Sequence, residues 1–156
     1  MDTKPLDDEL ARLASTLQPG ERRKLARSLA QDMRAANAKR IRANVMPYGA
    51  PMEPRKPRGR PARLGDVARA GRQLKPAKMF RKAPGSLITR ANAGSAELGF
   101  TSSASRIMAV HHFGLVDRVS AEDGSPRVAY PERVVLGLSA EDRERMLAKV
   151  ADHLSR

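Results

Sequence analysis

Apolar residues recur at helical spacing in the first stretch of the chain. Four leucines follow one another at intervals of four, three and four residues, which places them on one face of a predicted helix: Leu6, Leu10, Leu13 and Leu17. Acidic residues 7–9 fall in its first turn, where the helix dipole favours negative charge. Gln18-Pro19-Gly20 ends this helix, because Pro and Gly interrupt helices.

A second helix is predicted from about Glu21 to Asn44. Its apolar stripe consists of Leu25, Leu29, Met33 and Ala36, with Ile41 further on. Basic side chains occupy much of the remaining surface, which is typical of a solvated helix face. The short break between the two helices predicts an antiparallel helical hairpin over residues 1–46.

The pattern then changes to the alternation typical of strands. Within residues 95–101, three side chains point to the same side of a predicted strand: Ala96, Leu98 and Phe100. Leu87–Ala91 precedes this strand, and Asn92-Ala93-Gly94 is a turn, so the two segments predict a β-hairpin. Residues 116–120 and 127–130 predict a second hairpin around Glu122-Asp123-Gly124, because Asp-Gly is a strong turn signal.

Two further helices complete the predicted fold. One spans Ser102–His112 and ends at Gly114, and its apolar side chains are expected in the core: Ile107, Val110 and Phe113, with His111 as a core or boundary residue. The other spans about Ser139 to Leu154. Ser139 and Asp142 resemble a capping box at its start, and its apolar face consists of Met146, Leu147, Val150 and Leu154.

The elements predict an α+β fold in a single domain. We expect an N-terminal helical hairpin (1–46), a long arm (47–82) and a small α+β body (83–156) with an antiparallel β-sheet, a short helix and a C-terminal helix. The arm is predicted because Pro, Gly and charge dominate its composition, which disfavours a buried core. A short helix is possible near Leu64–Leu74.

Charge is concentrated in the arm. The chain carries a net charge of +13, and residues 47–82 hold 11 basic side chains against 2 acidic ones, whereas residues 83–156 hold 9 of each. We call residues 47–82 the basic arm. Such a segment favours an anionic partner, either nucleic acid or an acidic protein surface. Its candidate partner-binding residues are Arg55, Lys56, Arg58, Arg60 and Arg63.

One string within the arm suggests DNA as the partner. Lys56-Pro57-Arg58-Gly59-Arg60-Pro61 matches the core of an AT-hook, in which Arg side chains enter a narrow, electronegative minor groove. The same string arises easily by chance in a segment rich in Pro, Gly and Arg, and only one copy is present. Nonspecific attraction to phosphates is therefore the stronger form of a DNA-binding alternative.

Candidate chemistry is sparse. There is no cysteine, which suits a reducing cytoplasm, and the histidines 111, 112 and 153 lack the spacing of a metal site. No nucleophile elbow, phosphate loop or dinucleotide-binding glycine pattern is present. Residues 1–9 are polar and acidic and no apolar run spans a bilayer, so neither a signal peptide nor a membrane segment is expected. We expect a soluble protein that is not an enzyme and holds no cofactor or metal.

Several motifs in order carry a family resemblance. The first is Lys39-Arg40-Ile41-Arg42-Ala43-Asn44, followed by a Gly-x-Pro-x-x-Pro-Arg pattern at residues 49–55 and by Lys78-Met79-Phe80. The strongest block includes Val110–Leu115, Asp117-Arg118-Val119, Tyr130-Pro131-Glu132-Arg133, Leu136-Gly137-Leu138-Ser139 and Asp142. The chain resembles the virion-morphogenesis (tail-completion) family of contractile-tailed temperate phages. The residues taken as the family motif are Gly49, Pro51, Pro54, His111, Phe113, Gly114, Asp117, Arg118, Tyr130 and Pro131.

The resemblance implies a structural protein of the virion, assembled in the cytoplasm of a bacterial host. It would complete the head-proximal end of a contractile tail and enable head–tail joining at the neck. The implied partners are other copies in a ring, commonly sixfold, together with the tail terminator, tail tube or sheath, and neck or head-completion proteins. The resemblance implies no catalytic residue.

Overall fold

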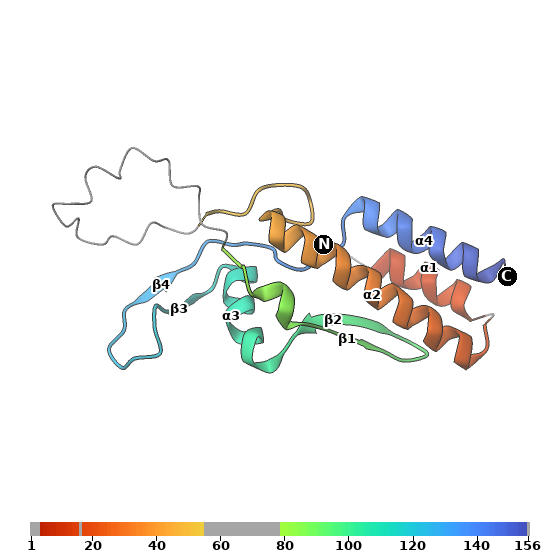
Figure 1. Ribbon diagram of the computed structural model, residues 1–156, viewed down its shortest axis with the longest axis horizontal. Coiled ribbons are helices and arrows are strands. Elements are labelled where there is room, and N and C mark those ends of the chain that lie inside the picture. Colours follow the sequence, from red (N-terminus) through yellow and green to blue (C-terminus); the bar gives the residue numbers. More distant parts are fainter. Residues whose placement is uncertain (1–3, 16, 55–78, 156) are drawn as a thin grey trace.

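The computed structural model describes residues 4–15, 17–54 and 79–155 of the chain. The elements are, in order, α1 (Lys4–Ala14), α2 (Pro19–Ala43), the 3-10 helix η2 (Ala83–Ser86), β1 (Leu87–Ala91), β2 (Ala96–Phe100), α3 (Ser102–Phe113), β3 (Val116–Arg118), β4 (Arg127–Ala129) and α4 (Ala140–Leu154). Helices α1 and α4 lie along one side of α2, and the β1–β2 hairpin lies along another (Figure 1). This arrangement confirms the predicted α+β fold with N-terminal helices and a C-terminal helix.

Helix α2 is the central element, and its two halves pack into different hydrophobic clusters. The first half contributes to the cluster of Leu6, Leu25, Leu29, Leu138, Met146 and Val150. The second half contributes to the cluster of Ala38, Ile41, Met52, Phe80, Leu87, Met108 and Val135. Ile41 lies 12 residues after Leu29 and is therefore rotated by about 120° around the helix. A single apolar stripe along α2 therefore cannot account for its packing into both hydrophobic clusters.

The strands form two separate two-stranded antiparallel sheets instead of one. In the first, β1 pairs with β2 in a register that places Thr89 opposite Leu98. Its turn is held by Asn92, whose Oδ1 accepts hydrogen bonds from the N–H groups of Gly94 (2.7 Å) and Ser95 (2.8 Å). The second pairs β3 with β4 and turns at Gly124, whose positive φ of 82° favours glycine. Both predicted hairpins are confirmed.

Helix α3 packs through a different face from the one expected. Ile107 and Phe113 were predicted in the core, but they are 59% and 65% exposed. The residues that face the body are instead Ala104, Met108 and His111, which follow the i, i+4, i+7 spacing of one helical face. The prediction was wrong for Ile107 and Phe113 because α3 carries apolar residues on more than one face. It was correct for Val110 and His111, which are buried.

Residues 46–54 pack against the body, although they share the composition of the arm. Met52 is only 2% exposed, and its N–H donates to Asn44 O at 2.8 Å. Gly49 takes a positive φ of 91° in the tight turn that follows Pro47. The possible helix near Leu64–Leu74 lies outside the described residues. Within the described ranges, no helix is long and apolar enough to cross a membrane.

A polar network joins α2 to the start of α4. Ser139 and Asp142 form the predicted capping box, and the buried Asp142 carboxylate also accepts hydrogen bonds from Arg40 and Arg145. Burial alone would raise the pKa of Asp142, but the hydrogen bonds outweigh it and hold the pKa below its usual value. Arg40 also donates to Gly137 O at 2.8 Å. The expected apolar face of α4 is correct for Met146 and Val150, whereas Leu147 is 37% exposed.

Candidate functional site

A buried arginine lies where the body meets the arm. Arg133, in the extended segment before α4, is 3% exposed. Its Nε donates to the carbonyl oxygen of Glu53 at 2.7 Å, and its Nη2 donates to that of Pro54 at 3.4 Å. Its Nη1 donates to Pro131 O at 3.3 Å and to Nδ1 of His111 at 3.2 Å. One guanidinium therefore joins residues 53–54 of the basic arm, α3 and the segment after β4.

Aromatic rings complete this site around His111. The His111 ring makes edge-to-face contacts with Phe80 at 5.1 Å and with Tyr130 at 5.0 Å between centroids. The backbone N–H of Arg133 also donates to His111 O at 2.7 Å. We call the side chains of Phe80, His111, Tyr130 and Arg133, with the carbonyls they bind, the Arg133 cluster.

The electrostatics of the Arg133 cluster depend on neutral partners. Among the described residues, no carboxylate lies within 4.0 Å of the Arg133 guanidinium, so main-chain carbonyls and an imidazole solvate its charge. Burial lowers the pKa of Arg133, although the guanidinium remains charged at neutral pH. Burial, followed by repulsion from Arg133, lowers the pKa of His111. Because an arginine only donates, neutral His111 accepts at Nδ1 and carries its proton on Nε2.

The Arg133 cluster holds both described ends of the arm's central segment. Glu53 and Pro54, whose carbonyls Arg133 binds, come directly before residues 55–78. Met79 and Phe80 come directly after that segment, and Phe80 is 8% exposed in the core next to His111. The chain therefore enters and leaves residues 55–78 at one fixed place on the body.

The structure brings together only part of the predicted site. Four of the family-motif residues meet at the Arg133 cluster: Pro54, His111, Tyr130 and Pro131. The five candidate arm residues, Arg55, Lys56, Arg58, Arg60 and Arg63, lie outside the described residues.

The remaining motif residues have local roles. Gly49 and Gly114 take positive φ, and a Cβ on Gly114 would lie 3.0 Å from the backbone nitrogen of Glu132. Pro51 forms an isolated bridge with Val45. Three others lie apart from the Arg133 cluster's hydrogen bonds: Phe113 contacts His112, Asp117 pairs with Arg106 at 3.0 Å, and Arg118 lies 3.6 Å from Asp123.

Arg133 and Phe80 are the residues that sequence reasoning missed as site residues. Both lie in the motif blocks that carry the family resemblance, but no local pattern marked either one as part of a common cluster. The available signal was a basic residue, Arg133, directly before the largely apolar residues 134–138. Charged side chains are rarely fully buried without partners.

The fold and the Arg133 cluster define a small α+β protein whose buried polar groups anchor a basic segment to a compact body. The chain belongs to the phage virion morphogenesis family, which matches residues 1–155. It is 33% identical over 156 residues to tail completion protein S of Escherichia phage P2, covering 98% of this chain and 97% of that protein. No solved structure matches it. These matches give no support to the DNA-binding alternative.

Proposed function

We propose that this chain is a structural subunit that completes the head-proximal end of a phage tail and enables the tail to join a filled head. Membership of the virion morphogenesis family supports a role in building the particle. The near full-length similarity to a tail completion protein supports the tail as the place of action. The tail terminator, the tail tube or sheath, and neck proteins are the partners we expect, with a ring of copies as the assembled form.

The observation that carries this proposal is the anchoring of the basic segment by the Arg133 cluster. Residues 55–78 include nine Lys or Arg side chains and a single acidic one. A segment of this charge, fixed to a rigid body at both ends, can contact an acidic surface without separating from its own subunit. A long segment rich in Pro, Gly and charge can cover a large partner surface at moderate affinity, which suits an assembly contact.

A catalytic role for His111, whose pKa is lowered by burial, is disfavoured by its contacts. His111 has its Nδ1 occupied by Arg133 and its ring enclosed between Phe80 and Tyr130. Within the described ranges, no three His, Asp or Glu side chains are grouped as metal ligands. The arrangement therefore favours a structural part for His111 in holding the arm.

Deletion of the gene in the phage or prophage that encodes the chain tests the proposal. Negative-stain electron microscopy of the lysate should show filled heads beside separate tails, and the wild-type protein supplied in trans should restore joined particles. A lysate that contains joined particles in normal number without the protein would contradict the proposed function. The same images separate a tail defect from a head defect, because a head-assembly protein would leave empty or missing heads.

A further inference from the structure

The β3–β4 hairpin presents a sheet face that nothing in the described chain covers. Cross-strand partners share a face, so Val116 and Ala129 lie on the same side as Arg118 and Arg127. All four residues are exposed, and Val116 is 54% exposed. We call these four residues the outer face. The opposite side turns toward α3, where Asp117 accepts a hydrogen bond from Arg106.

The outer face carries an unfavourable pair of like charges. Arg118 lies directly opposite Arg127, and like charges in directly opposed positions destabilise a strand pair. Asp123 offers little compensation, because it lies 3.6 Å from Arg118 on a fully exposed turn. Arg127 makes no ion pair within 4.0 Å in the described part of the chain, although its charge adds to the hydrogen bond from the Arg118 N–H in lowering the pKa of Asp117. A two-stranded sheet is marginal in water by itself, so the outer face suits a partner that supplies carboxylate and apolar side chains together.

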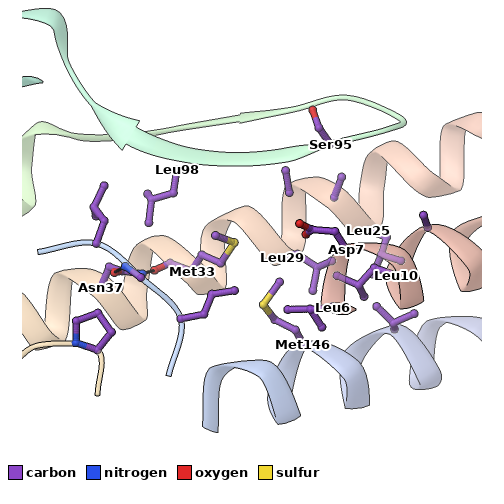
Figure 2. A pocket seen from close by; sticks show the side chains of 18 of the residues that line it. Leu6, Asp7, Leu10, Leu25, Leu29, Met33, Asn37, Ser95, Leu98 and Met146 are labelled. Carbon is purple, nitrogen blue, oxygen red and sulfur yellow. Dashed lines mark hydrogen bonds between the residues drawn. The ribbon is translucent and has the colours of Figure 1, made fainter. Parts of the chain in front are cut away.

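The same chain contains a groove with that chemistry. A cavity of about 1000 Å³ lies between α1, α2, β2 and residues 134–138. Most of its lining is apolar, including Leu10, Met33 and Leu98 (Figure 2). We call it the α1–β2 groove. Figure 2 shows Asp7 between the hairpin and the helices, beside Leu25 and Leu29.

The charges in the groove complement the outer face. Its ionised lining residues are Asp7, Glu132 and Arg22, which give a net negative charge. The Asp7 carboxylate makes no ion pair among the described residues, so it is available to a cation from outside. The β3–β4 hairpin and α1 are well separated in the molecule (Figure 1), so one copy cannot satisfy both surfaces internally.

We infer that the outer face of one copy docks in the α1–β2 groove of a second copy. Val116 and Ala129 pack on the apolar lining, while Arg118 and Arg127 approach Asp7. The contact joins two different surfaces, so a pair of copies retains one free groove and one free outer face. Further copies can therefore add head to tail, forming a closed ring or an open chain. This inference rests on the ring of copies in the proposed function and deepens it by naming the two surfaces that meet.

Charge reversal tests the contact with the full-length chain. One variant carries R118E and R127E, and the other carries D7R. Because R118E faces Asp123 and R127E lies near Asp117, circular dichroism first verifies that the double variant is folded. Each alone should self-associate roughly tenfold more weakly than wild type in sedimentation experiments, because like charges then meet at the contact. Mixing the two should restore association, since each outer face then meets a groove of opposite charge. A monomeric wild type, or a mixture that remains monomeric, would overturn the inference.

Cross-linking supplies a second readout, because the chain has no cysteine. A protein with V116C mixed with one carrying L10C should form a disulfide-linked dimer under mild oxidation. The matched control replaces L10C with L147C, which is exposed on α4 and outside the groove. No dimer with L10C, or equal dimer with L147C, would contradict the contact. Neither experiment involves tails or heads, so its failure is distinct from failure of the proposed function.

Discussion

Arg133 donates through Nη1 to Nδ1 of His111 at 3.2 Å, so a buried cation and a titratable ring share one hydrogen bond. Protonation of His111 would replace that bond with repulsion. The pKa of His111 is lowered from 6.5 by burial and by Arg133, so the folded state resists protonation. The unfolded chain therefore binds more protons once the pH falls below about 6.5.

We predict that the free energy of unfolding decreases as the pH falls from about 7 toward 5. Urea unfolding at several pH values measures it. His111→Asn keeps an acceptor for Arg133 but does not titrate, so it should reduce the pH dependence. His112, whose pKa is also lowered by burial, contributes in the same window, and His112→Gln separates its share. An unchanged slope in His111→Asn would contradict this explanation.

Removing the Arg133 guanidinium should loosen residues 53–54 of the basic arm. Arg133→Met leaves the carbonyls of Glu53, Pro54 and Pro131 without their donor, at a cost of roughly 2–4 kcal/mol in the free energy of unfolding. Hydrogen exchange should accelerate at Met52, which precedes these carbonyls. Arg90→Met is the matched control, because Arg90 is exposed on β1 and should change neither quantity. Equal exchange in the two variants would show that Arg133 does not anchor the segment.

Asp142 should be the costliest single carboxylate to neutralise. Asp142→Asn removes the charge that pairs with Arg40, which would remain largely buried, and the expected loss is about 3–5 kcal/mol. Glu141→Gln provides the comparison, since its pair with Arg145 is exposed and worth under about 1 kcal/mol. Thermal or urea unfolding of both variants gives the difference. Similar losses would mean that the network joining α2 to α4 is weaker than its burial indicates.

Gly137 should not tolerate a side chain. A Cβ at this position would lie 2.8 Å from Cγ of Pro47, so Gly137→Ala should cost about 1–3 kcal/mol through overpacking. Gly85→Ala is the control, because nothing lies within 4 Å of its Cβ position and its φ is not positive. Unfolding measurements on both variants decide the matter, and a neutral Gly137→Ala would show that Pro47 moves freely.

Elements defined by neighbouring residues were predictable from sequence. The spacing of Leu6 and Leu10 in α1, the Asn92 turn, the Asp-Gly turn and the Ser139 cap each depend on interactions within a few residues, although α1 ends at Ala14, before the predicted Leu17. The buried face of α3 was not predictable, because the apolar residues of this helix fit more than one stripe. Only the packing against α2 and β2 selects Met108 over Ile107. For the same reason, sequence could not show that α2 changes face between Leu29 and Ile41.

The Arg133 cluster was beyond sequence reasoning for a different reason. Apart from Pro131, the side-chain partners of Arg133 are 22, 79 and 80 residues away along the chain, so no local period brings them together. The family motif pointed to His111, Tyr130 and Pro131 as individual residues but not to a common site. Only the three-dimensional arrangement shows that they anchor the two ends of residues 55–78.

We propose that the anchored basic segment makes the contact by which the tail is completed. The most direct measurement is the fraction of joined virions, counted by electron microscopy, when a gene deletion is complemented with R58Q/R60Q/R63Q. The matched control is R23Q/R27Q/R90Q, which removes the same charge from exposed positions of the body. We predict separate heads and tails with the first variant and joined virions with the second. Normal joining with both variants would contradict the claim.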